Sequence, residues 1–76
     1  MGNVADYASA VAKWVGGRVK DVREARGWTQ EALASALTQA GHPISRVGVA
    51  KTESATRPVT IEDLAALAKT LEVPVT

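Results

Sequence analysis

The residues of this chain with the clearest chemical potential lie in the run SRVGVAKTE, positions 45–53. Arg46 and Lys51 carry positive hydrogen-bond donors, and Val47 and Ala50 between them are small and apolar. In a DNA major groove, arginine or lysine can bond guanine O6 and N7, and a small apolar group can touch a thymine methyl. The alternative interpretation is an ordinary solvated helix that happens to carry two charges.

The opposite side of the same segment has a different character. At helical spacing, Val49, Thr52 and Glu53 lie three and four residues apart and share one face, away from the four residues above. This asymmetry predicts a helix that packs by one side and leaves a small, cationic side uncovered.

The elements that would position this segment are separated by turn signals. Gly27, the triplet Gly41-His42-Pro43, Arg57-Pro58 and Pro74 interrupt the chain, and the stretches between them have helical periodicity. The sequence therefore predicts an all-α fold, a compact domain of four or five short helices with no strand.

The first helical stretch carries apolar residues at helical spacing from Val4 to Val22 and should stop at Gly27. Gly16 and Gly17 interrupt it, and each glycine costs about 1 kcal/mol relative to alanine inside a helix. Residues 4–26 could form one weakened helix or two helices that meet at this pair. We favour two, so that residues 1–14 form an additional N-terminal helix and residues 15–76 form the main domain.

The starts of the later helices have recognisable caps. Thr29, Ser45 and Thr60 each precede a helical stretch and can accept a hydrogen bond from its first turn. Thr60 and Asp63 have capping-box spacing. Hydrophobic staples are expected between Ile44 and Val49 and between Val59 and Leu64. The last helix should present Ile61, Leu64, Leu67, Ala68 and Leu71 to a core.

Composition limits the function classes. The chain has 76 residues, a net charge of +1 and no cysteine, so we expect one small domain without a disulfide or a thiolate metal site. Positive charge lies in the first three quarters: residues 1–30 carry five basic and three acidic groups, whereas residues 59–76 carry one and three. No apolar run reaches the length of a membrane span, and the N-terminus is a poor secretory signal, which predicts a cytoplasmic protein.

Catalytic motifs are weak. His42 lies in a turn with no cysteine or paired carboxylate near it in the sequence, and Glu62 and Asp63 are best explained as first-turn helix charges. There is no phosphate-binding loop and no GxGxxG. We expect no enzyme activity, no catalytic residue, no metal site and no cofactor.

Three segments in order resemble the phage-repressor (XRE-type) helix-turn-helix family. They are VGGRVKDVREARGWTQEALA, SRVGVAKTES and RPVTIEDLAALAKTLEVP, and the resemblance extends over residues 15–75, about four fifths of the chain. The resemblance implies a lambda-repressor-like domain of bacterial or phage type, in which one helix crosses the DNA backbone and the next enters the major groove. It implies a cytoplasmic, nucleoid-associated transcription regulator that binds specific double-stranded DNA sequences.

The resemblance also assigns roles to residues. Thr29, Gln30 and Arg57 match positions that contact phosphate, and Arg23 and Glu53 match an internal ion pair that ties the first helix to the end of the recognition helix. Ala55 departs from the family pattern, which usually has glycine at this position, so a left-handed residue is less favourable there. The base-contacting positions match Ser45, Arg46, Val47, Ala50 and Lys51.

Partners other than DNA are less defined. The resemblance gives no sign of a small-molecule effector, and a two-fold homodimer would present its recognition helices about 34 Å apart. Tyr7, Val11 and Trp14 could supply such an interface, but the favoured interpretation is that Trp14 and Trp28 fill a small core. The rival function is an antitoxin-like or adaptor module that binds protein through the same scaffold.

Overall fold

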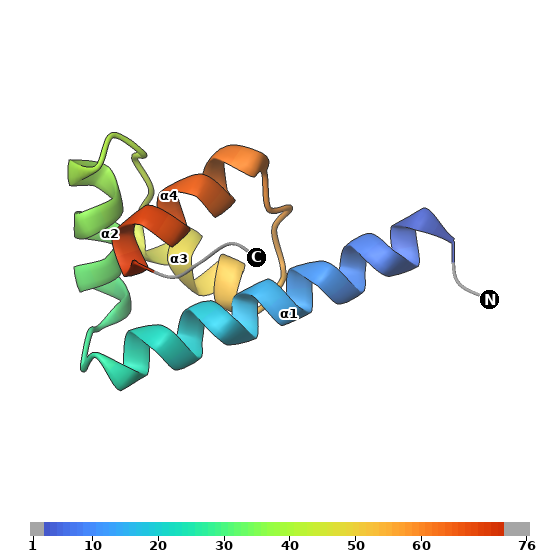
Figure 1. Ribbon diagram of the computed structural model, residues 1–76, viewed down its shortest axis with the longest axis horizontal. Coiled ribbons are helices and arrows are strands. Elements are labelled where there is room, and N and C mark those ends of the chain that lie inside the picture. Colours follow the sequence, from blue (N-terminus) through green and yellow to red (C-terminus); the bar gives the residue numbers. More distant parts are fainter. Residues whose placement is uncertain (1–2, 73–76) are drawn as a thin grey trace.

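The computed structural model describes residues 3–72, and these residues form four helices and no strand. Helix α1 spans Val4–Ala25, α2 spans Gln30–Gln39, α3 spans Arg46–Glu53 and α4 spans Ile61–Leu71. In Figure 1, α2, α3 and α4 gather around one half of α1, and the N-terminal half of α1 extends away from them. The molecule is therefore elongated, with principal extents of 40 × 22 × 21 Å.

Helix α1 is one continuous helix of 22 residues, so the expectation of two helices that meet at Gly16 and Gly17 is wrong. The boundary expected between residues 14 and 15 consequently falls inside a helix. The two glycines have different surroundings. A Cβ at Gly16 would lie 2.5 Å from the carbonyl oxygen of Thr52 and 2.7 Å from that of Glu53, whereas a Cβ at Gly17 would meet nothing within 4 Å. Gly16 is thus explained by the close approach of α3, and not by a break in α1.

The predicted caps of α2 and α3 are present. The Thr29 hydroxyl accepts a hydrogen bond from the Ala32 N–H at 3.0 Å, and the Ser45 hydroxyl accepts one from the Gly48 N–H at 3.1 Å. Between the helices, Gly41 has φ +93° and the His42 N–H bonds the Leu37 carbonyl oxygen at 2.9 Å. This is the left-handed helix ending that glycine favours, and it turns the chain sharply toward α3.

Helix α3 ends on a strained residue. Ala55 has φ 59°, a left-handed conformation although the residue is not glycine, and the Thr56 N–H bonds the Lys51 carbonyl oxygen at 2.9 Å. A left-handed alanine costs roughly 1–2 kcal/mol relative to glycine. Helix α4 then begins with the predicted capping box of Thr60 and Asp63. The predicted stop at Pro74 lies outside the described residues.

The core is small and draws on all four helices. Leu33, Leu37 and Val49 are its most deeply buried large side chains, and Trp28 and Ile44 pack against its edge. The remaining buried apolar residues are Val15, Val19, Ala34, Leu67 and Leu71. Trp28 therefore packs against the core, as the sequence predicted.

Several residues of the apolar pattern lie outside this core. Ile61 was expected to face the core but is 81% exposed, and Trp14 is 67% exposed. Val4, Tyr7 and Val11 are also exposed, because nothing in the described part of the chain packs on the N-terminal half of α1. No helix in residues 3–72 combines the length and the apolar character needed to cross a membrane.

Candidate nucleic-acid interface

Helix α3 has the two-sided character that its sequence predicted. Val49 and Thr52 are almost completely buried, and the Thr52 hydroxyl donates to the Gly48 carbonyl oxygen at 2.9 Å. Helix α3 packs against both α1 and α2, and Val49 and Thr52 lie on its buried side. Burial of this side leaves the other side of the helix free to meet a second molecule.

The uncovered side of α3 carries the five residues assigned to base contacts. Arg46, Lys51 and Ser45 are exposed, Val47 is 50% exposed and Ala50 is partly exposed. Within residues 3–72, neither the Arg46 guanidinium nor the Lys51 ammonium group forms a hydrogen bond or ion pair with another side chain. This side of α3 carries small apolar side chains and two cations without side-chain partners in the described part of the chain, as a helix that enters a major groove requires.

An ion pair holds the C-terminal end of α3. The Arg23 Nε lies 2.6 Å from Glu53 Oε2, its Nη2 lies 3.1 Å from Glu53 Oε1, and its Nη1 donates to the Trp28 carbonyl oxygen at 2.6 Å. The side chains of Arg23 and Glu53 are only 9% and 4% exposed. The hydrogen bonds to Glu53 raise the pKa of the Arg23 guanidinium above its usual value. This pair joins α1, the start of α2 and the end of α3, and so fixes the orientation of α3.

The start of α2 lies against the same carboxylate. The Gln30 side-chain amide donates to Glu53 Oε1 at 3.2 Å, and Gln30 is half-buried. Thr29 precedes it as the helix cap. The structure therefore brings the two residues expected to contact phosphate next to the end of α3. Gln30 has an internal role as well, which the sequence did not suggest.

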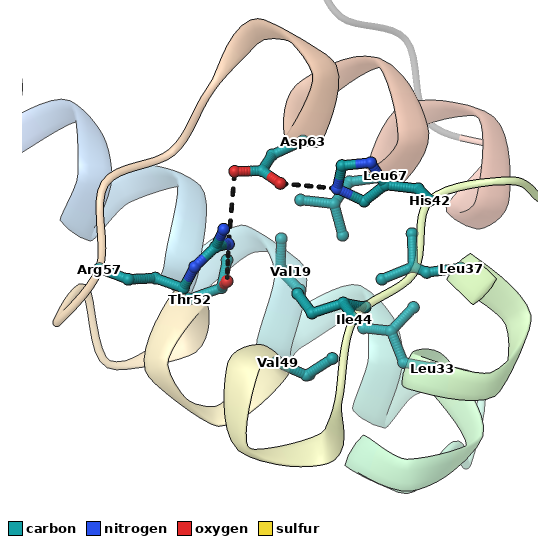
Figure 2. A pocket seen from close by; sticks show the side chains of 10 residues that line it. All are labelled: Val19, Leu33, Leu37, His42, Ile44, Val49, Thr52, Arg57, Asp63 and Leu67. Carbon is teal, nitrogen blue, oxygen red and sulfur yellow. Dashed lines mark hydrogen bonds and ion pairs between the residues drawn. The ribbon is translucent and has the colours of Figure 1, made fainter.

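Arg57, the third residue expected to contact phosphate, points inward (Figure 2). Its Nη1 donates to the Thr52 hydroxyl at 3.0 Å and lies 3.3 Å from Asp63 Oδ2. A phosphate contact by Arg57 stays a prediction, and it would compete with this internal pairing.

Asp63 is the centre of a polar cluster that the sequence analysis missed. Its Oδ1 lies 2.7 Å from His42 Nε2, and its Oδ2 accepts a hydrogen bond from the Thr60 N–H at 2.9 Å. His42 has no paired carboxylate near it in the sequence, and folding brings it a single carboxylate partner from 21 residues away. The capping-box spacing predicted that Asp63 caps the start of α4. No local pattern indicated that His42 and Arg57 would also contact its carboxylate.

The charge on Asp63 is stabilised by these neighbours. Burial alone would raise the pKa of Asp63, but the Thr60 backbone N–H, His42 and Arg57 together hold it below the usual value of 3.8. The cluster ties the α2–α3 connection and the α3–α4 connection to the start of α4.

The cavity beside this cluster does not resemble a ligand site. It is lined mainly by apolar core residues, among them Val19, Leu33 and Leu67 (Figure 2), and its volume is about 10 Å³. That is room for about one water molecule. Among residues 3–72, no group of three or more histidine, aspartate, glutamate or cysteine side chains could hold a metal ion.

Comparison with known families agrees with this geometry. Residues 14–76 match the model of the helix-turn-helix domain family. The chain belongs to the helix-turn-helix domain family. This agrees with its resemblance to the XRE-type members, and membership of this family indicates DNA binding. No curated protein and no solved structure matches the chain.

The family match begins at residue 14, near the point where α1 first packs on the other helices. The helix-turn-helix domain of this protein thus uses the C-terminal half of α1 as its first helix. The preceding turns of α1 are an extension of that same helix.

Proposed function

We propose that this protein is a transcription regulator that binds specific double-stranded DNA sequences by placing α3 in the major groove. The observation that carries the proposal is the pair of exposed cations, Arg46 and Lys51, on the free side of a helix whose other side is buried. The Arg23–Glu53 pair supports it, because a reading helix must be held in one orientation for its side chains to meet base edges in register.

Within this proposal, side chains divide into two groups. Arg46 and Lys51 read base edges, with Ser45, Val47 and Ala50 allowing close approach at the groove floor. Thr29 and Gln30 contribute phosphate contacts at the start of α2, where free backbone N–H groups favour an anionic oxygen. The charge balance of the whole chain is only +1, so affinity depends on where these groups lie and not on total charge.

The test begins with selection of bound sites from a random double-stranded DNA pool, which reports binding, motif and half-site symmetry together. Affinity for the selected site is then measured by fluorescence anisotropy at several salt concentrations. A steep fall of affinity with salt is expected, because phosphate contacts release counterions. A flat salt dependence, or no retained DNA, would contradict the proposal.

Single variants separate the residues proposed to contact bases from those proposed to contact phosphate. Arg46→Ala and Lys51→Ala should each cost about 1–3 kcal/mol on the selected site and relax preference at one base position. Gln30→Ala should weaken all sequences alike. Lys69→Ala removes an exposed cation from α4, and serves as the matched control for charge loss. Equal losses on selected and random DNA for all variants would refute the assignment of base readers.

The second candidate is an antitoxin-like or adaptor module that binds protein on the same scaffold. One observation favours it: the apolar side chains Val4, Tyr7, Val11 and Trp14 are exposed along α1. The selection and the salt titration distinguish the two, because a module that binds only protein would retain no DNA in the selection and would show no steep salt dependence.

A further inference from the structure

The exposed apolar residues of α1 form a continuous stripe. Val4, Tyr7, Val11 and Trp14 follow one another at intervals of three, four and three residues, so they share one side of the helix. They are 84%, 65%, 56% and 67% exposed. The next positions at this spacing, Arg18 and Asp21, are exposed and charged, so the N-terminal stripe ends at Trp14.

This half of α1 is built as a stable helix although no other described element covers it (Figure 1). Its first turn has a full capping box: the Asn3 side chain accepts from the Asp6 N–H, and Asp6 accepts from the Asn3 N–H, both at 3.1 Å. A capping box satisfies two otherwise free donors. The stripe is therefore presented on a preformed surface, which lowers the entropic cost of binding a partner.

We propose that the N-terminal stripe binds the same stripe of a second copy of this chain, and that the two helices run antiparallel. In that arrangement Trp14 of each copy faces Val4 of the other, and Tyr7 faces Val11. Large residues thereby meet small ones along the whole interface, which is the condition for interdigitated packing. A parallel pair would instead set Trp14 against Trp14 and leave a gap between the valines.

The residues that flank the stripe allow the two helices to approach closely. Ala8 and Ala10 border the stripe, so neither bulk nor charge keeps the two backbones apart. Asp6 and Lys13 are the only charged residues between positions 3 and 14, and both lie on the side of the helix away from the stripe, so the pairing buries no charge.

The size of the stripe sets the strength of the association. A covered tyrosine or tryptophan buries about 150–250 Å², so the four partly exposed side chains of both copies supply on the order of 800 Å² in total. This lies below the range of stable complexes and within that of weak, reversible ones. The dimer should therefore form at high protein concentration, or when a common ligand holds two copies together.

The pairing also determines how far apart the two domains lie. The packed half of α1 is centred near Val19, ten residues beyond the midpoint of the stripe, and this separates the two domain centres by about 30 Å along the helix axis. One turn of DNA separates half-sites by about 34–36 Å. This consequence rests on the proposed function, whereas the pairing itself does not.

Sedimentation equilibrium of the full chain without DNA, from about 10 µM to about 1 mM, tests the pairing over the Kd range of a weak complex. The average mass should rise from 7.9 kDa toward twice that value. The double variant Tyr7→Ala with Trp14→Ala should raise Kd at least about tenfold, which corresponds to the loss of two central aromatic anchors. Ile61→Ala removes an equally exposed apolar side chain outside the stripe and should leave Kd unchanged within about twofold.

A protein that stays monomeric over the whole range, or a double variant that associates like the wild type, overturns the proposal. Because DNA is absent, this failure is distinct from a failure to bind DNA. Circular dichroism of each variant checks that it remains helical.

Orientation is tested by disulfide formation, because the chain has no cysteine of its own. A mixture of Val4→Cys and Trp14→Cys chains should form mixed disulfides in preference to self-paired ones. Two copies of position 4 would lie about 15 Å apart along an antiparallel pair, beyond the reach of a disulfide. Self-paired disulfides in excess would overturn the antiparallel arrangement.

Discussion

The two halves of α1 have similar apolar patterns but differ in how far their apolar side chains are buried. In the half that ends at Trp14, the large apolar residues are exposed; in the half that begins at Val15, Val15 and Val19 are buried. The difference lies in what approaches each half, because α3 and α4 both pack on α1 and neither reaches its N-terminal turns. An apolar stripe therefore predicts that something will cover a helix, but it does not say whether the cover comes from the same chain.

The packed half is distinguished by groups that allow or enforce a close approach. Gly16 admits the backbone of α3, and Arg23 reaches across to Glu53. The free half has neither a glycine at a contact nor a long-range ion pair within the described residues. The following predictions change one half while leaving the other as the reference.

Arg23→Ala should have the largest effect, a loss of about 3–5 kcal/mol in the free energy of unfolding, because it leaves the buried Glu53 carboxylate without its cation. Arg18→Ala removes an exposed arginine five residues earlier on the same helix and should change stability by less than about 0.5 kcal/mol. Urea unfolding followed by circular dichroism measures both. Similar values for the two variants would show that the ion pair does not anchor α3.

Gly16→Ala should cost about 1–3 kcal/mol, since its Cβ would collide with the Thr52 and Glu53 carbonyl oxygens of α3. Gly17→Ala has open space around it and should instead stabilise the protein by about 0.5–1 kcal/mol through helix propensity. The same urea experiment applies. A stabilising Gly16→Ala would mean that α1 and α3 lie farther apart than the structure places them.

Acid should weaken the packed part of the molecule first. The folded-state pKa of Asp63 is below its usual value of 3.8, so its carboxylate contributes stability at neutral pH. That contribution remains complete above the unfolded-state pKa and is lost as pH falls through the folded-state pKa. Asp63→Asn should therefore flatten the fall of thermal stability at low pH.

Asp6→Asn is the matched control for acid stability in the free half, because Asp6 is exposed and caps only its own helix. The thermal stability of this variant should fall at low pH in the same way as that of the wild type. If the thermal stability of Asp63→Asn falls at low pH as steeply as that of the wild type, the His42–Asp63–Arg57 cluster does not stabilise the fold in the way predicted.

The smallest effect is expected from the stripe itself. Tyr7→Ala and Trp14→Ala, measured at low micromolar concentration where the chain is monomeric, should each change stability by less than about 0.5 kcal/mol. Thermal unfolding by circular dichroism measures this. A loss of 2 kcal/mol or more, of the size seen for core aromatics, would show that these residues pack within the monomer.

Local signals predicted much of the fold. The caps at Thr29, Ser45 and Thr60 and the glycine endings at Gly27 and Gly41 were correct, because each depends on hydrogen bonds and dihedral angles within a few residues. The split of α1 was wrong because propensity assigns a glycine pair a cost and cannot show that Gly16 is needed for a contact with α3.

The candidate site was predicted unevenly for a similar reason. The free side of α3 follows from helical spacing alone, and its exposed cations are where the sequence placed them. Arg57 was expected to face outward, but its preference for Asp63 and Thr52 could not be read from its neighbours in the chain.

The sequence by itself determined where α2, α3 and α4 begin, that glycines follow the ends of α1 and α2, and which side of α3 is apolar. These properties arise from interactions between residues close together in the chain. Only the tertiary structure decided which half of α1 is covered, how Gln30 and Arg23 share Glu53, and that His42 meets Asp63. Those outcomes depend on distances between segments that the chain brings together only when the core has formed.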